Sequence, residues 1–226
     1  MPRIARVVVP GCAHHVTQRG NYRQTVFDCV DDRIFYLETL RKYADLHGTR
    51  IWAWCLMPNH VHLIVVPENE KSLARTFEKA QAAHSFRMHS RRCQTGHLWQ
   101  NRYYSCVLDD SHLQAAVRYV ELNPVRAGLV DKPEDYDWSS AWSHLNKAQS
   151  PYLDSGCPVL EDFPDWRSFL IDPDPLVQMD VIRRCTKTGR PAAEQAFLAR
   201  LELDTGRTLH APRKGRPPRN LPLPCT

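Results

Sequence analysis

The sequence lacks several features that would place the protein in a common class. It has no apolar run long enough to span a membrane, and its start, Met-Pro-Arg-Ile-Ala-Arg, lacks the apolar core of a signal peptide. Its eight cysteines include no Cys-x-x-Cys pair, which argues against a zinc ribbon and a disulfide framework. No internal repeat is visible. We therefore expect a cytoplasmic protein with free thiols, built as one domain plus an appended segment.

Acidic residues are absent from the end of the chain, where the last one is Asp204. The basic residues beyond it are Arg207, Arg213, Lys214, Arg216 and Arg219. These cations equal the formal net charge of +5, so the residues before them sum to zero. A neutral body with a basic, Pro-rich tail favours a tail that binds a polyanion. The alternative is a solvated end of the chain without a ligand.

Hydrophobic patterning predicts a succession of strands and helices over the first 123 residues. The expected elements are a strand at 13–18, a helix at 31–47, strands at 50–57 and 60–67, a helix at 72–91, a strand at 98–108 and a helix at 111–123. Pro58-Asn59 suits a tight turn between two strands, and Pro124 disfavours helix before it. The first six elements have the order of the split β-α-β unit of ferredoxin-like folds, an α+β architecture. Two helices would cover one face of the sheet, and the last helix is the candidate to cover the other.

The composition changes beyond about residue 146, where Pro, Asp, Ser and Gly become frequent. We predict a domain at 1–146 and an extension at 147–226. The extension is expected to hold two helical stretches, at 175–185 and 192–202, and to end in the basic tail.

Two histidines, His60 and His62, lie at the start of an apolar strand. Because side chains alternate along a strand, both imidazoles project from one face, as two ligands of a single metal ion must. The spacing by itself favours two half-buried sheet histidines without a ligand, so a third group on the same face is needed to support a site.

Tyr119 and Asn123 supply such a group. On a helical projection they share a stripe with His112, beside the apolar stripe of the helix. A second polar stripe, formed by Gln114, Arg118 and Glu121, is expected to face solvent. A helix laid over the open sheet face would bring Tyr119 and Asn123 to the histidine pair, whereas the alternative is an edge tyrosine that merely packs.

These groups together suit metal-assisted phosphoryl transfer. A free phenol titrates near pH 10, so a tyrosine nucleophile needs compensation of charge at neutral pH. A divalent cation on the phosphate neutralises developing negative charge. Two imidazoles and an amide oxygen suit Mg²⁺ or Mn²⁺ in the cell, although imidazoles also tolerate Zn²⁺ or Ni²⁺.

Two blocks of the sequence resemble the signatures of REP-associated tyrosine transposases, which belong to the single-tyrosine HUH transposases of bacterial insertion sequences. They are Met-Pro-Asn-His-Val-His-Leu at 57–63 and Tyr-Val-Glu-Leu-Asn-Pro-Val-Arg-Ala-Gly-Leu-Val at 119–130. Weaker matches lie at 18–21, 98–102 and 136–140, so the resemblance covers about residues 1–146.

The resemblance implies a ferredoxin-like fold, with His60, His62 and Asn123 as metal ligands and Tyr119 as the nucleophile that forms a covalent 5′-phosphotyrosine. It also implies hairpin-forming single-stranded DNA as substrate, a nucleoid-associated location in the cytoplasm, and a monomer or weak homodimer. Candidate DNA-binding residues are Arg19, Asn21, Arg23, Trp99, Arg102, Arg126, Arg213, Lys214 and Arg216, with Tyr22 and Trp99 as stacking platforms.

Two other functions stay open at this point. A metallohydrolase could use the H-x-H pair to activate water, although the common H-x-H-x-D-H extension is absent, since Leu63 and Ile64 follow the pair. A hairpin-binding protein without catalytic activity is the second alternative.

Overall fold

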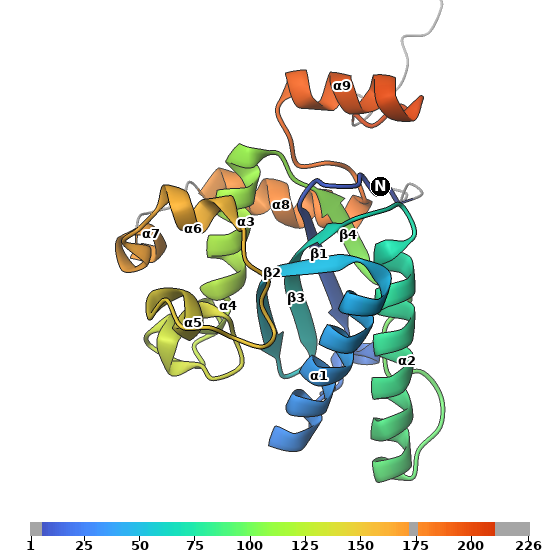
Figure 1. Ribbon diagram of the computed structural model, residues 1–226. Helices are drawn as coiled ribbons and strands as arrows, with labels where there is room; N and C mark the ends of the chain where they lie inside the picture. The colour runs from blue at the N-terminus through green and yellow to red at the C-terminus, as the bar shows by residue number, and fades with distance from the viewer. Residues whose placement is uncertain (1–5, 172–175, 211–226) are drawn as a thin grey trace, which may run out of the picture.

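The computed structural model describes residues 6–171 and 176–210 (Figure 1). The predicted DNA-binding residues Arg213, Lys214 and Arg216 lie outside the described residues. Within the described part of the chain, no helix is both long enough and apolar enough to cross a membrane.

A four-stranded antiparallel sheet forms the centre of the molecule. Its strands are β1 (His14–Arg19), β2 (Thr49–Met57), β3 (His60–Pro67) and β4 (Tyr104–Val107), in the order β2-β3-β1-β4. Pro58 and Asn59 form the turn between β2 and β3, as predicted. This strand order and the intervening helices confirm the predicted α+β, ferredoxin-like arrangement.

One face of the sheet is covered by two long helices, α1 (Val30–His47) and α2 (Ser72–Arg92), which pack side by side (Figure 1). Alternate residues of the strands point into this layer, and they meet buried side chains of both helices. The cluster includes Val16, Leu63, Leu56, Leu40 and Phe77. Gly48 ends α1 in a left-handed conformation that glycine adopts without strain.

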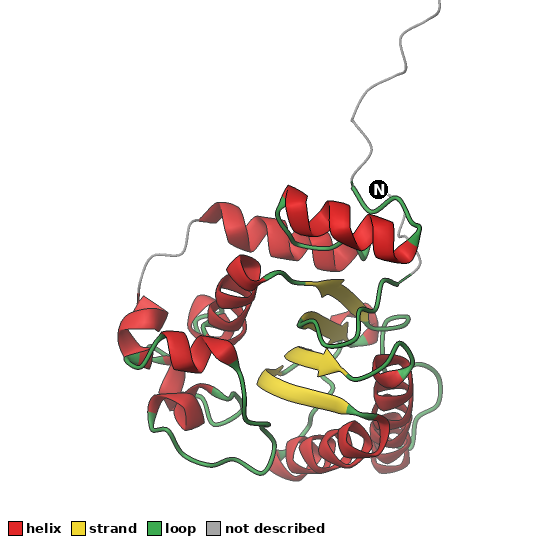
Figure 2. Cartoon of the chain, turned by 45° about the horizontal axis from the view of Figure 1, so that its top comes forward, coloured by secondary structure: helices red, strands yellow, loops and turns green. Residues whose placement is uncertain are grey.

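The opposite face is covered by two helices that come from distant parts of the chain. They are α3 (Asp110–Glu121), which lies over β2 and β3, and α8 (Leu176–Thr188), which lies over β4 and β1. Figure 2 shows the strands enclosed between these helices and α1 and α2. The prediction that the helix after the fourth strand covers the open face is therefore confirmed for half of that face, and the extension supplies the other half.

The fourth strand is shorter than the predicted 98–108. Asn101 has a positive φ of 56°, which an extended strand does not allow, and the ladder starts only at Tyr104. The preceding residues form a loop that is fixed to the first strand, because the Gln100 amide donates to the Arg19 carbonyl at 2.7 Å and the Asn21 amide donates to the Leu98 carbonyl at 2.8 Å.

The remaining elements are short. They are the 3-10 turns Asn21–Arg23 and Pro133–Asp135 and the helices α4 (Asn123–Arg126), α5 (Ala141–Leu145), α6 (Pro158–Asp162), α7 (Trp166–Ile171) and α9 (Gln195–Thr205). The helical stretches predicted at 175–185 and 192–202 correspond to α8 and α9. Trp166 and Phe169 of α7 share one buried cluster with Val117 of α3. The division into 1–146 and 147–226 stays a prediction, and the two parts share a core.

The predicted solvent-facing stripe of α3 is wrong for two of its three residues. Arg118 and Glu121 are buried, since the segment from Ser139 to Leu170 packs over this face of the helix. The Glu121 carboxylate accepts hydrogen bonds from Ser140 Oγ at 2.5 Å, His144 Nδ1 at 2.6 Å and Trp166 Nε1 at 2.8 Å. Helical periodicity groups these polar residues on one face of α3, which predicted exposure to solvent. The later segment instead buries them, because it supplies their hydrogen-bond partners.

Candidate functional site

His60 and His62 begin β3 and project from the face that α3 and α8 cover. Their ring centroids are 4.9 Å apart and the rings are nearly perpendicular. His62 is buried, whereas His60, beside the turn, is half-buried. The predicted placement of both imidazoles on one face is thus what the strand geometry produces.

Tyr119 of α3 reaches the same face. Its ring centroid lies 5.4 Å from that of His62, with the two rings close to perpendicular. The tyrosine is 8% exposed and packs in the apolar cluster under α3, and it also lines a cavity. The structure therefore brings the predicted nucleophile and the predicted ligand His62 together.

Asn123 begins α4, the short turn that continues the chain after α3 through Pro124. Its side chain is buried, and the amide nitrogen has no hydrogen-bond partner. A buried amide without a partner costs free energy unless a ligand or water satisfies it. That nitrogen is a hydrogen-bond donor, which an acceptor on a ligand or a water would satisfy, whereas the side-chain oxygen is the atom that would bind a metal ion.

His15 of β1 is a member of the site that the sequence did not reveal. Its ring stacks on that of His62 with the centroids 5.1 Å apart, and its Nε2 is 2.9 Å from His62 Nδ1. Its Nδ1 is 2.8 Å from Thr186 Oγ1 on α8. The available signal was strand alternation, because His15, Thr17 and Arg19 must share the face of β1 that adjoins His62.

Two guanidinium groups lie against Tyr119, and one of them belongs to the extension. The Arg126 guanidinium carbon is 4.2 Å from the centre of the tyrosine ring, and that of Arg183 is 5.4 Å away. Arg183 Nε also donates to the phenol oxygen at 3.5 Å. Arg183 was not predicted, because sequence patterning indicates a helix at this position without showing what it covers.

A cavity of about 560 Å³ opens between the sheet face and these helices. Tyr119, His62 and His15 form part of its wall. The other lining residues are Thr17, Arg19, Tyr22, Arg23, Gln100, Tyr104, Arg183, Thr186 and Lys187. Four of them are cationic, so the cavity suits an anionic ligand with room for more than one phosphate group.

Burial keeps the imidazoles of the site neutral. It lowers the pKa of His60 to about 4 and that of His15 to about 3, and it holds the pKa of His62 well below its ordinary value. For His62, the neighbouring imidazoles and arginines add smaller effects of the same sign. A neutral imidazole has a lone pair to offer, which is the form that binds a metal ion.

The predicted DNA-binding residues divide into two groups. Arg19 and Arg23 line the cavity, Asn21 lies in the turn between them, and Arg126 contacts Tyr119. Trp99 is 7% exposed and packs in the core against α2, where its indole nitrogen donates to the Gln81 carbonyl. It presents no free ring face to a base, and we do not retain it as a stacking platform.

Arg102 lines a different cavity, of about 400 Å³, on the side of α2. The structure does not bring this residue to the histidine pair. Tyr22, by contrast, borders the first cavity and is 94% exposed, so its ring is open to solvent.

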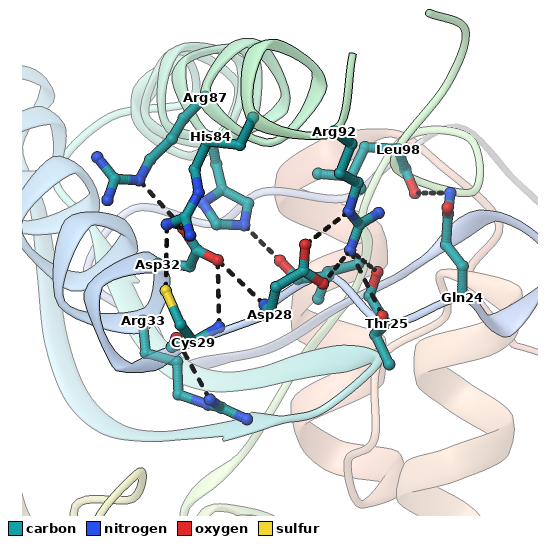
Figure 3. Close-up of polar contacts among 12 residues, drawn as sticks. Gln24, Thr25, Asp28, Cys29, Asp32, Arg33, His84, Arg87, Arg92 and Leu98 are labelled. Carbon is teal, nitrogen blue, oxygen red and sulfur yellow. Dashed lines mark hydrogen bonds and ion pairs between the residues drawn. The ribbon is translucent and has the colours of Figure 1, made fainter. Parts of the chain in front are cut away.

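A network of ion pairs holds the loop that carries Tyr22 and Arg23 (Figure 3). The Arg92 guanidinium of α2 binds both carboxylate oxygens of Asp28, at 2.8 and 2.6 Å, and donates to the Thr25 carbonyl at 2.9 Å. The buried carboxylate of Asp32 accepts from Arg87 and from two backbone amides. These contacts fix the loop to the layer formed by α1 and α2.

Among the described residues there is no group of three or more His, Cys, Asp or Glu side chains that could hold a metal ion. A metal site here would therefore depend on two imidazoles and the Asn123 amide. Neutral buried imidazoles fit that use, with the side-chain oxygen of Asn123 as the third ligand atom, and the site lacks the acidic cluster of a site held by carboxylates.

The chain is similar to transposases. Residues 8–123 match the family model described as "Transposase IS200 like". A Haemophilus influenzae protein named as a REP-associated tyrosine transposase is 27% identical over 99 residues, which cover 39% of this chain and 56% of that protein. The match therefore spans little more than half the length of this relative.

The fold is also found in a solved structure. A REP-associated tyrosine transposase bound to a REP hairpin superimposes with a TM-score of 0.55, at 18% sequence identity, covering 69% of this chain and 93% of that one. At this identity the likeness concerns the fold, and it agrees with the resemblance seen in the sequence blocks around His60 and Tyr119.

Proposed function

The chain belongs to the family of IS200-like transposases, and we propose that it cleaves and rejoins single-stranded DNA with Tyr119 as the nucleophile. The observation that carries this proposal is the position of Tyr119. Its ring lies 5.4 Å from His62 at the wall of a cationic cavity, although α3 and β3 are far apart in sequence. Two arginines contact its ring, and both would attract negative charge that forms on the phenol.

In the proposed reaction the Tyr119 oxygen forms a bond to a backbone phosphorus. The bond between that phosphorus and the 3′-oxygen of the preceding nucleotide breaks, which leaves a 3′-hydroxyl and a 5′-phosphotyrosine. The phenol loses its proton and the departing oxygen gains one, so charge and atoms balance. Attack by a 3′-hydroxyl on the phosphotyrosine reverses these changes and joins the strands.

Arg183 and Arg126 would stabilise the negative charge of the phenol oxygen, as attacking group in cleavage and as leaving group in joining. His60, His62 and Asn123 would hold a divalent cation, Mg²⁺ or Mn²⁺. When bound, the cation would supply positive charge to the phosphate oxygens. The neutral imidazoles support this assignment, and the side-chain oxygen of Asn123 would be its ligand atom.

The cationic residues around the cavity define a path for the DNA backbone. Arg19 ends β1, Arg23 lies in the turn that follows, and Lys187 belongs to α8. The exposed ring of Tyr22 lies beside this path, and it suits stacking with an unpaired base. The path is therefore suited to single-stranded DNA.

A hairpin is the proposed form of the substrate. The similar solved structure is described as bound to a REP hairpin, and we extend that substrate to this chain as part of the proposal. Hairpin-forming repeats would present an unpaired strand next to a stem, which matches a protein that needs an accessible phosphate.

The experiment that tests the function uses end-labelled hairpin DNA with an unpaired flank, incubated with the protein and Mg²⁺. A covalent adduct that survives denaturation is expected. A metallohydrolase would yield cleaved DNA without an adduct, and a hairpin-binding protein would yield a complex that denaturation dissociates.

A further inference from the structure

His60 and His62 each use Nδ1 for a hydrogen bond within the protein. His62 Nδ1 lies 2.9 Å from His15 Nε2, and His60 Nδ1 lies 2.6 Å from Asn59 Oδ1. Which atom carries the proton in each contact decides which nitrogen keeps a lone pair. The partners beyond these contacts settle the question.

We propose that two directed hydrogen-bond chains, each ending on a backbone carbonyl, hold His60 and His62 in the tautomer with the proton on Nδ1. Both Nε2 atoms then keep their lone pairs. His15, Thr186 and Asn59 are positioning residues in this arrangement, and the extension sets the state of His62 through Thr186.

The first chain begins on α8. Thr186 Oγ1 lies 2.8 Å from the Ile182 carbonyl, 2.8 Å from His15 Nδ1 and 3.1 Å from Cys106 Sγ. A hydroxyl has one proton to donate and two lone pairs to accept with. A carbonyl can only accept, so the hydroxyl proton lies toward Ile182, because two oxygens at 2.8 Å without a proton between them would repel.

The two lone pairs of Thr186 Oγ1 then accept from Cys106 and His15. Burial raises the pKa of the Cys106 thiol to about 12, so the thiol is protonated and able to donate. His15 must place its proton on Nδ1 to donate to Thr186. As a neutral imidazole it has no proton on Nε2, and this atom accepts from His62 Nδ1.

The second chain lies in the turn between β2 and β3. The Asn59 side-chain nitrogen donates to the Arg23 carbonyl at 3.2 Å. The opposite orientation of the amide would place its oxygen against that carbonyl, which is unfavourable. The Asn59 oxygen therefore faces His60, and His60 Nδ1 carries the proton that this oxygen accepts.

The consequence for metal binding rests on the proposed function. A histidine ligand that donates its second N–H to a fixed acceptor is held in one orientation and one tautomer. Without Thr186 or Asn59 the affected histidine would distribute its proton over both nitrogens, and its share of the ligand-competent form would fall.

The test is ¹⁵N NMR of histidine-labelled full chain without metal, which distinguishes the two tautomers of each ring, combined with Mn²⁺ binding. The wild type should show His60 and His62 with the proton on Nδ1. Thr186→Val should lose that state at His62 and keep it at His60, with Mn²⁺ affinity reduced roughly 10- to 100-fold. Thr186→Ser, which keeps the hydroxyl, is the matched control and should resemble the wild type.

Asn59→Ala changes the half-buried turn between β2 and β3 and should alter His60 without altering His62, so the proposal stays testable if Thr186→Val does not fold. A wild-type signal with the proton on Nε2 of His62, or an unchanged His62 signal in folded Thr186→Val, would overturn it. If the tautomers respond as expected but the protein binds no Mn²⁺, the result would support the two hydrogen-bond chains. It would at the same time reject the metal ligands of the proposed function.

Discussion

Arg183 and Tyr119 come from opposite sides of the predicted boundary at residue 146, and the guanidinium Nε donates to the phenol oxygen at 3.5 Å. Arg183 also forms an ion pair within α8, in which its Nη1 lies 3.3 Å from Oδ1 of the largely exposed Asp180. Arg183 is thus shared between the surface and the proposed nucleophile.

We predict that Arg183→Ala lowers the rate of adduct formation at saturating hairpin DNA by about 10- to 100-fold, because charge on the phenol oxygen loses its stabilising cation. Arg183→Lys should retain more of the rate. Replacing Tyr119 by a fluorotyrosine, whose phenol ionises more readily, should reduce the difference in rate between the protein with Arg183 and the Arg183→Ala variant. Rates that are equal in all these proteins would show that Arg183 only packs.

For Tyr119→Phe we expect no adduct, with hairpin affinity within a few-fold of the wild type, because the hydroxyl acts in the transition state rather than in binding. Gel analysis after denaturation and a binding titration measure the two quantities. Tyr104 also lines the cavity, so Tyr104→Phe is the matched control and should form the adduct. An adduct in Tyr119→Phe would move the chemistry to another tyrosine.

Metal dependence is the third expectation. A chelator or His60→Ala should abolish cleavage, and Asn123→Ala should raise the Mn²⁺ concentration needed for half-maximal rate without unfolding the protein. Circular dichroism checks the fold, and a metal titration of the rate gives the second quantity. Full cleavage by His60→Ala in chelator would exclude the metal site.

Stability should fall in mild acid because the folded protein holds buried histidines neutral, among them His14 and His84, which lie away from the site. Burial lowers the pKa of each to about 4, and hydrogen bonds to backbone carbonyls offset only part of that effect. Near pH 5 the unfolded chain binds protons at these residues and the folded chain does not, so acid favours unfolding. Each should cost about 2 kcal/mol between pH 7 and pH 5.

Urea denaturation at the two pH values measures this loss. His84→Gln should be less stable than the wild type at pH 7 and should lose less stability on acidification. A free energy of unfolding that is the same at pH 5 and pH 7 would contradict the assignment of neutral, buried imidazoles.

The basic tail gives the last prediction. Leu209 is buried with Val7, Val107 and Leu201, so a truncation that tests the tail must keep it and end after His210. Removing residues 211–226 should weaken hairpin binding and flatten its salt dependence, because fewer counterions are released. The adduct rate at saturating DNA should stay the same. An unchanged salt slope would leave the tail as a solvated end of the chain.

The sequence was sufficient for the ferredoxin-like unit because its signals are local. The alternation around His60 and His62, the turn at Pro58-Asn59 and the helical spacing before Gly48 each act within a few residues. Those same signals placed Tyr119 beside His62, since a helix following the fourth strand has one open face to cover.

The residues that the extension contributes to the site and to the core could not be predicted from such local signals. A helix around Arg183 was predicted from periodicity, but periodicity does not show which surface a helix covers. Glu121 was expected in solvent because a carboxylate is rarely buried unless it is paired. Its partners, Ser140, His144 and Trp166, come from later segments that the pattern of the helix does not reveal. Trp99 is the opposite case, an aromatic residue that could have stacked on DNA and instead completes the core.

The covering of one sheet face by α8 has a consequence for the protein during its synthesis. Translation proceeds from the N-terminus, so the four strands and α1 to α3 leave the ribosome well before α8 does. Until α8 emerges, the part of the sheet formed by β1 and β4 has no cover, and the apolar side chains around Cys106 meet water. The nascent chain therefore exposes this part of the sheet until residue 188 is available, and a slow step in that interval would give the uncovered surface more time to associate with other chains.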